Sequence, residues 1–317
     1  MTATEPAPVR GRRRYWQLGI TLAVAVAACA LLAAHRDTLN TGADRLAAAD
    51  REWLLAAGLA ALATWVCAAV VQQGAVAERL PPGRLVATQF AASAANHLLP
   101  AGTGATAVNL RFLTRCGLST TRSATALAVK AAAGGIVRLL LGIALLLTSP
   151  GTLRLTARVP HLLVLLPVAG CVVAALAALA LNRRLRAWVR PAAGKVLADV
   201  REVHRRGARA CALWGGSLAF ALLHATVIVA VVHALDLPLS EGRVVMAYLV
   251  ASGVAALLPT PGGLGSLDAA LALSLTAAGA PSAAAVSVVF GYRLLTAWLP
   301  MAPGLLVLAV LARRSAV

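Results

Sequence analysis

The feature that most constrains the fold is a series of long apolar segments separated by short, basic loops. Hydrocarbon offers no water to backbone N–H and C=O groups, so only helices and closed barrels can cross it. With 60% of 317 residues hydrophobic, we expect an all-α, polytopic integral membrane protein with one transmembrane domain, 15–312, between polar tails at 1–14 and 313–317. Six segments are long enough to span a bilayer as helices: Tyr15 to Ala34, Trp53 to Val76, Ala124 to Leu147, His161 to Leu181, Cys211 to Leu235 and 283–311.

Two further apolar segments, 85–110 and Leu257 to Leu275, are interrupted by proline and glycine. Proline removes a backbone donor and glycine disfavours helix, so each interruption predicts a broken helix. Irregular backbone at membrane depth has to be buried in protein or line a cavity. The residues that mark the breaks are Pro100, Gly102 and Gly104 in the first segment, and Pro259, Pro261, Gly262, Gly263 and Gly265 in the second.

The distribution of charge favours re-entrant elements, which return to the side from which they enter. With that topology, twenty of the 29 Arg and Lys residues lie inside, nine of them in 182–209, and the outside loops hold six balanced by six acids. If 85–110 crossed the membrane instead, the nine basic residues of 182–209 would lie outside, against the positive-inside rule. We therefore expect a membrane protein with both termini in the cytoplasm.

The re-entrant topology makes two units, 53–147 and 211–311, that enter the membrane from opposite sides. Leu-Leu-Pro at 98–100 matches Leu-Leu-Pro at 257–259, and a glycine turn follows each about 20 residues later. This pattern predicts an inverted repeat with a site near the midplane. The basic linker 182–209 between the units is either an amphipathic helix on an anionic leaflet or a plain cytoplasmic loop.

Several function classes are excluded or unsupported. The net charge of +18 does not indicate a nucleic-acid-binding protein, because the basic residues lie in loops between apolar spans. The five cysteines and six histidines show no CxxC or HExxH spacing, so we predict no metal and no cofactor. Nucleophile–base constellations and nucleotide-binding motifs are also lacking, so we expect no enzyme.

The charged residues inside the apolar segments are the candidates for ligand binding. Arg and Lys complement phosphate, and Asp268, one turn past the second break, could recognise an amine. Asp268 and Arg293 could equally pair with each other and stabilise a buried break, and Arg111 could be only a topological charge. The candidate substrate-binding residues are Asp268, Arg293, Arg111, Lys130, Arg138, Asn96 and His97.

Three sequence stretches resemble the lysylphosphatidylglycerol synthase transmembrane region family. They are L-L-P-T-P-G-G-L-G-S-L-D at 257–268, A-G-A-P-S-A-A-A-V at 278–286 and Y-R-L-L-T-A-W-L-P at 292–300, and N-H-L-L-P-A-G-T-G at 96–104 is similar to the signature of the first half. The family includes the flippase half of the bacterial multiple-peptide-resistance factor. The resemblance implies an inner-membrane lipid translocase whose partners are anionic or aminoacylated phospholipids.

The chain departs from the family pattern at two places. Asp268 stands where the family usually has Glu, and the span after the first break has Lys130 and Arg138 without the acid of the family's Glu-Arg pair. The chain ends at Val317, so we expect it to lack the soluble domain that transfers lysine. Two alternatives stay open: a secondary transporter of a small polar or anionic solute, and a non-transporting membrane partner of a lipid or envelope enzyme.

Overall fold

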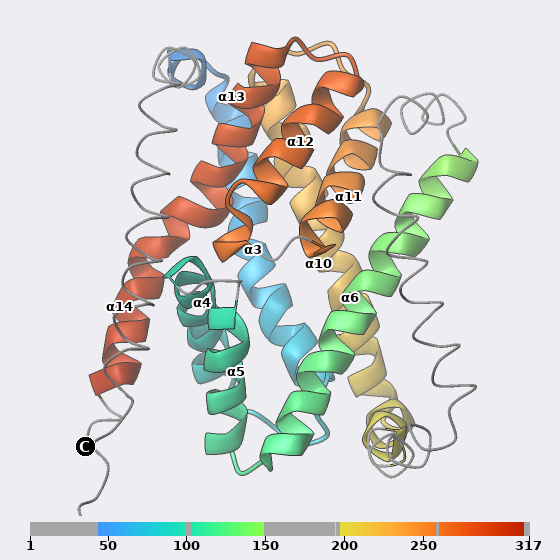
Figure 1. Ribbon diagram of the computed structural model, residues 1–317, viewed down its shortest axis with the longest axis vertical. Helices are drawn as coiled ribbons and strands as arrows, with labels where there is room; N and C mark the ends of the chain where they lie inside the picture. Colours follow the sequence, from blue (N-terminus) through green and yellow to red (C-terminus); the bar gives the residue numbers. More distant parts are fainter. Residues whose placement is uncertain (1–43, 99–102, 149–193, 195–196, 258–259, 314–317) are drawn as a thin grey trace, which may run out of the picture.

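In a computed structural model, which describes residues 44–98, 103–148, 194, 197–257 and 260–313, the regular elements of these ranges are helical (Figure 1). The first half of the molecule comprises α3 (Arg51–Gly74), α4 (Pro82–Leu98), α5 (Thr103–Arg115) and α6 (Thr120–Thr148). The second half comprises α10 (Gly207–Ala234), α11 (Glu241–Leu257), the 3-10 turn η3 (Pro261–Gly263), α12 (Ser266–Ala277), α13 (Ser282–Arg293), the π-helical turn η4 (Leu294–Trp298) and α14 (Leu299–Arg313).

Four helices of the described part are long and apolar enough to cross a membrane. They are α3, α6, α10 and the continuous run of α13, η4 and α14. Each coincides with an apolar segment that the sequence predicts to span, so these four predictions are confirmed. The predicted spans Tyr15 to Ala34 and His161 to Leu181, like most of the linker 182–209, lie outside the described residues.

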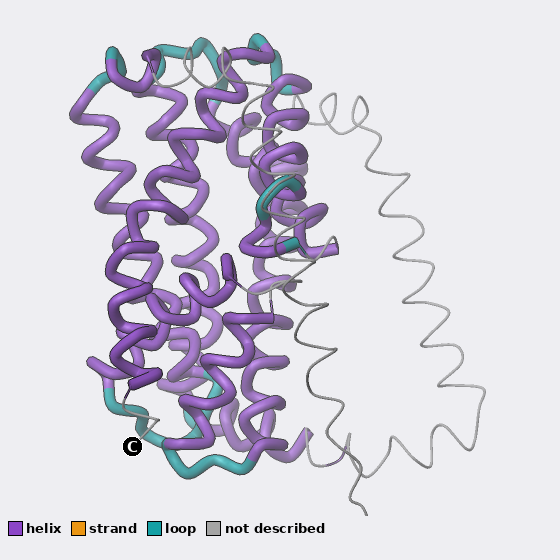
Figure 2. Tube along the Cα trace, turned by 60° about the vertical axis from the view of Figure 1, so that its left-hand side comes forward, coloured by secondary structure: helices purple, strands orange, loops and turns teal. Residues whose placement is uncertain are grey.

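Both broken segments form helical hairpins: α4 with α5, the first hairpin, and α11 with η3 and α12, the second hairpin. In Figure 1 the first hairpin begins and ends at the lower end of the bundle, and the second begins and ends at the upper end. Their tips meet at mid-height, where α4 contacts η3. In Figure 2 the loops lie at the two ends of the bundle, with a further loop at mid-height where the helices are interrupted.

The two halves are joined mainly by α3 and α10, which lie side by side and make the most extensive helix contact of the described part. Small residues allow this approach, as expected for helices that pack in lipid. A Cβ on Gly74 would overlap the backbone of Leu213, and one on Gly216 would lie 3.0 Å from a methyl group of Val71. The start of α3 is fixed by Asp50, whose Oδ1 caps the amides of the first turn.

Large apolar side chains face outward along the spanning helices. Leu59 of α3 is 68% exposed and Leu139 of α6 is 64% exposed. A soluble protein rarely exposes so many large apolar side chains on one face, so these rows are suited to contact with lipid. The outward-facing residues on α3 and α6 are Leu55, Leu59, Leu62, Val66, Ile136, Leu139, Leu140, Ile143 and Leu147.

The last spanning segment contains prolines at 300 and 303, for which helix kinks are the ordinary expectation. The segment is helical throughout, and the π-helical turn η4 ends at Trp298, two residues before Pro300. A wider turn accommodates a residue that cannot donate its amide to the preceding turn. Further along α14, a Cβ on Gly304 would lie 2.7 Å from the carbonyl oxygen of Phe90 in α4.

Candidate functional site

The turn of the second hairpin is held by one arginine. Arg293, the last residue of α13, is buried, with 8% of its side chain exposed. Its Nη1 donates to the carbonyl oxygen of Gly262 (3.0 Å) and its Nη2 to that of Gly263 (2.6 Å), while its Nε donates to Oδ1 of Asp268. One guanidinium thus satisfies two backbone acceptors that the broken helix leaves without a helical partner.

Asp268 completes the same arrangement from the first turn of α12. Its Oδ2 accepts a hydrogen bond from the amide of Gly265 at 2.9 Å, and its side chain is 29% exposed. Gly262, Gly263 and Gly265 all have positive φ (58°, 69° and 83°), a region that costs other residues free energy. The carboxylate therefore stabilises the turn and neutralises Arg293, which is the pairing that the sequence left open as an alternative to ligand binding.

The tips of the two hairpins meet at His97, in the last turn of α4. Its Nδ1 lies 2.9 Å from the carbonyl oxygen of Ser93, and its Nε2 is buried without a hydrogen-bond partner among the described residues. A Cβ on Gly262 would overlap the imidazole ring. Within the first hairpin, a Cβ on Gly104 would overlap the carbonyl of Ala95, so the arms α4 and α5 are in backbone contact there.

A separate polar cluster lies in the first half, around Lys130 of α6. Its Nζ donates to Oε1 of Gln72 in α3 (3.1 Å) and to Oε1 of Gln89 in α4 (3.2 Å). Gln89 in turn donates to Oδ1 of Asn109 in α5 (3.1 Å), and Asn109 donates to the carbonyl oxygen of Ala105 (2.9 Å). Lys130 of α6 thus contacts α3 and α4 directly, through neutral amide oxygens, and α5 indirectly, through Gln89.

Lys130, Gln89 and Asn109 line a cavity of about 370 Å³ between α3, α4, α5, α6 and α10, a volume within the usual range for small-molecule sites. Lys130, Gly134 and Arg138 lie on its α6 wall at four-residue intervals, which places them on one helix face. Arg138 donates to the carbonyl oxygen of Gly134 (3.1 Å), and its guanidinium carbon lies 5.8 Å from the centre of the Phe220 ring.

The charge of this cavity is positive. Its described lining contains two basic side chains, Lys130 and Arg138, and no carboxylate. Among the described residues, neither cation forms an ion pair within 4.0 Å, although Arg293 does. Both side chains are half-buried, and a cation that is partly desolvated beside only neutral groups is costly, so the cavity is electrostatically suited to an anion.

Five of the substrate-binding residues proposed from the sequence fall into two groups. Lys130 and Arg138 line the cavity, whereas Asp268, Arg293 and His97 lie where the hairpins meet.

The other proposed residues lie elsewhere. Asn96 is half-buried near Gly104 in the first hairpin, and Arg111 is exposed on α5 and does not line the cavity. Gly104 lies inside α5 and the side chain of Pro261 is not described, while Pro100, Gly102 and Pro259 lie outside the described residues.

Sequence reasoning missed Gln72 and Gln89 as members of a site. Both are buried, at 0% and 5% exposed, and Nε2 of Gln72 has no hydrogen-bond partner among the described residues. The available signal was a polar amide within a strongly apolar helix, where such groups usually contact another helix. The sequence does not say which helix, because Lys130 follows Gln72 and Gln89 by 58 and 41 positions.

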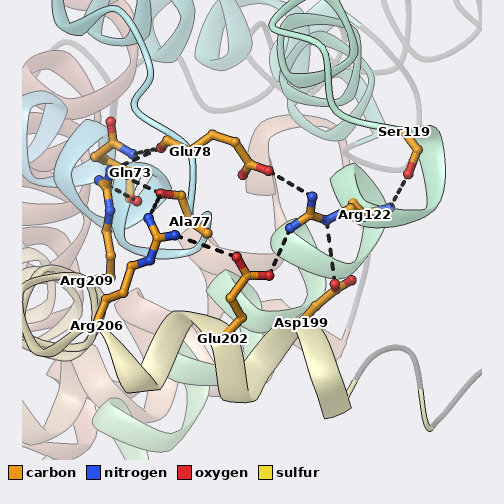
Figure 3. A network of polar contacts seen from close by, with 9 residues as sticks. All are labelled: Gln73, Ala77, Glu78, Ser119, Arg122, Asp199, Glu202, Arg206 and Arg209. Carbon is orange, nitrogen blue, oxygen red and sulfur yellow. Dashed lines mark hydrogen bonds and ion pairs between the residues drawn. The ribbon is translucent and has the colours of Figure 1, made fainter.

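An ion-pair network joins the end of the basic linker to the first half (Figure 3). Arg122 of α6 contacts Glu78 (2.8 Å), Asp199 (3.5 Å) and Glu202 (3.2 Å).

Two further arginines continue the network. Arg206 donates to the carbonyl oxygen of Ala77 (2.9 Å), and Arg209 donates to that of Gln73 (3.2 Å). The helix 197–205 is thereby tied to the turn between α3 and α4, and these two arginines contact the protein's own backbone.

The comparison with protein families gives a match. A family model described as Lysylphosphatidylglycerol synthase TM region matches residues 16–304. No curated protein matches the chain. The matched range includes both hairpins and the cavity and ends within α14.

Proposed function

Since the chain belongs to the lysylphosphatidylglycerol synthase TM region family, we propose that it moves a phospholipid head group across the bilayer without altering it chemically. The observation that carries the proposal is the cavity of the first half, where Lys130 and Arg138 lie without a carboxylate. A phosphate is the group that every phospholipid carries into such a site, and Lys and Arg bind it through charge-assisted hydrogen bonds.

The helical arrangement supports this role. We propose that the two hairpins are re-entrant elements of an inverted repeat, because they enter from opposite ends and turn at mid-height. Interrupted helices in lipid need partners for their free backbone groups, and Arg293 supplies two of them in the second hairpin. Transporters of this design bind their substrates beside the interrupted helices, as the cavity lies beside α4 and α5.

Charge supports a bacterial cytoplasmic membrane with the lower end of Figure 1 in the cytoplasm. That end holds the turn between α3 and α4, the start of α6 and the start of α10, which contribute Arg79, Arg84, Arg115, Arg122 and 201–209. The opposite end carries acidic loops with Glu52, Asp236 and Glu241 as well as basic residues. A basic excess at one end is the usual mark of the cytoplasmic side.

The test is translocation in proteoliposomes that contain head-group-labelled phospholipids. The protein should speed transbilayer movement over protein-free vesicles, and Lys130→Gln and Arg138→Gln should each lower the rate about tenfold or more, because each removes a charge-assisted contact. Arg111→Gln is the matched control, since it removes an exposed cation that does not line the cavity. Rates equal to protein-free vesicles across a panel of head groups would refute the proposal.

The alternatives give different results in the same system. A transporter of a small anionic solute would take up labelled solute, and that uptake would depend on Lys130 and Arg138 while lipid movement stayed at background. A docking partner would lose function on charge reversal in the linker 182–209 but would tolerate Asp268→Asn. These outcomes separate the three functions without knowledge of the physiological substrate.

A further inference from the structure

We propose that the cavity of the first half selects a net-anionic phosphodiester head group that carries no amine, and that Asn109 sets this selectivity. The inference rests on the proposed function and specifies its substrate. It begins from the observation that Lys130 and Arg138 share one wall of the cavity and that no carboxylate lines its described part.

The amide oxygens around Lys130 orient the ammonium group but do not neutralise it. Gln72 and Gln89 each accept one hydrogen bond from Nζ, at 3.1 and 3.2 Å. Nη1 of Arg138 donates a hydrogen bond to the carbonyl oxygen of Gly134, and the buried Nε of Arg138 has no hydrogen-bond partner among the described residues. A bound phosphodiester would supply the missing negative charge and accept hydrogen bonds from both side chains.

Asn109 and Asp268 lie at the same sequence distance from the Leu-Leu-Pro of their hairpins, Asn109 in the second turn of α5 and Asp268 in the first turn of α12. Asn109 follows the proline of its Leu-Leu-Pro, Pro100, by nine positions, and Asp268 follows Pro259 by nine. In the second half this position supplies the carboxylate that pairs with Arg293. In the first half it supplies a buried neutral amide, 5% exposed, that reaches Lys130 only through Gln89. The first hairpin therefore has a neutral amide where the second has a carboxylate, and Lys130 has no counter-ion among the described residues.

The same arrangement disfavours a head group that carries an amine. An ammonium group in the cavity would meet two like charges and, in the described lining, no carboxylate to accept its hydrogen bonds. Like-charge contact in a desolvated site is an effective means of rejecting a ligand. An aminoacylated phospholipid would therefore bind more weakly than its parent anionic lipid.

The experiment measures binding of two lipids to the full chain in phosphatidylcholine nanodiscs. Phosphatidylglycerol and lysyl-phosphatidylglycerol share the phosphodiester and differ by the aminoacyl group. Phosphatidylglycerol should bind at least about tenfold more tightly, which corresponds to one unfavourable charge contact. Glycerophosphate in solution is added as competitor; displacement of the lipid by glycerophosphate at matching affinity would reassign the cavity to a free phosphate ester.

Two substitutions at one position test the role of Asn109. Asn109→Asp adds a carboxylate to the cavity lining, next to Gln89, and should lower phosphatidylglycerol binding about tenfold while it raises that of lysyl-phosphatidylglycerol. Asn109→Ala also loses the amide but adds no charge, so it should keep the preference of the wild type. An equal loss of preference in both variants would show that Asn109 acts only through packing, and would overturn its assignment as the selectivity residue.

Translocation of both lipids in the same vesicles keeps the two proposals apart. Faster movement of lysyl-phosphatidylglycerol than of phosphatidylglycerol would overturn the selectivity and leave lipid translocation intact. Background rates for both lipids would overturn translocation, and the binding ratio would still decide the selectivity. If Asn109→Asp fails to fold, Lys130→Gln and Arg138→Gln take its place, and each should reduce the binding ratio.

Discussion

The two halves of the molecule use the same device, a basic side chain of a spanning helix that faces a helical hairpin, with opposite electrostatic results. In the second half, Arg293 meets the carboxylate of Asp268 and two backbone carbonyls, and every part of the guanidinium is engaged. In the first half, Lys130 meets only amide oxygens and lines a cavity. The second site has the features of a structural clamp, and the first has those of a binding site.

The two halves also differ in which residue precedes the Leu-Leu-Pro of each hairpin by nine positions. Gln89 lies nine positions before Leu98, and Tyr248 lies nine positions before Leu257. Gln89 lines the cavity, whereas Tyr248 is 3% exposed and belongs to the apolar core of the second half, beside Tyr292. A large aromatic ring fills more space than a glutamine, and Tyr248 does not line the cavity.

The largest expected effect comes from a matched pair of substitutions, one in each half. Arg293→Met should lower the free energy of unfolding by about 3–5 kcal/mol, because it leaves a partly buried carboxylate and two carbonyls without partners. Lys130→Met should change it by no more than about 1 kcal/mol, since loss of an uncompensated buried cation offsets loss of two hydrogen bonds.

Thermal unfolding in detergent can be followed with a thiol-reactive dye, because Cys67 and Cys116 are half-buried in the folded protein. If Arg293→Met and Lys130→Met destabilise the protein equally, Arg293 and Lys130 do not differ as a structural clamp and a binding residue. A double variant, Arg293→Met with Asp268→Leu, should recover part of the loss, because it also removes the orphaned carboxylate.

The contact between the hairpins gives an intermediate effect. Gly262→Ala should lower the free energy of unfolding by about 2–4 kcal/mol, because a positive φ and overlap with the His97 ring both oppose a Cβ. Gly265→Ala should cost only about 1–2 kcal/mol, since its φ is also positive but no heavy atom lies within 4 Å of the added Cβ.

The difference between these two glycines measures how tightly the hairpins meet. If His97 causes the extra cost, then His97→Ala in the Gly262→Ala background should restore stability to the level of Gly265→Ala. Equal stabilities of the two single variants would mean that the hairpin tips do not depend on this contact.

The smallest effect should come from Arg122, although it faces three carboxylates. Its side chain is 39% exposed, and solvent screens such pairs. Arg122→Gln should lower the free energy of unfolding by about 0.2–1 kcal/mol, and added salt should reduce the difference. A loss as large as that of Arg293→Met would show that the number of carboxylates, and not burial, sets the strength of the clamp.

Much of the architecture could be predicted from sequence because membrane insertion depends on local properties. Length and apolar character identified the four described spanning helices, and proline with glycine identified both interruptions. Hydrocarbon acts on each segment separately, since every segment must satisfy its own backbone hydrogen bonds.

Only the tertiary structure decided which charged side chains have a counter-ion among the described residues. The sequence places Asp268, Arg293, Lys130 and Arg138 in apolar surroundings, but it does not show which of them pair with an opposite charge. Packing pairs the first two and leaves the other two in a cavity lined also by Gln89 and Asn109. The reason is physical: desolvation of a charge is a property of its own segment, whereas its neutralisation depends on side chains that reach it from helices distant in the sequence.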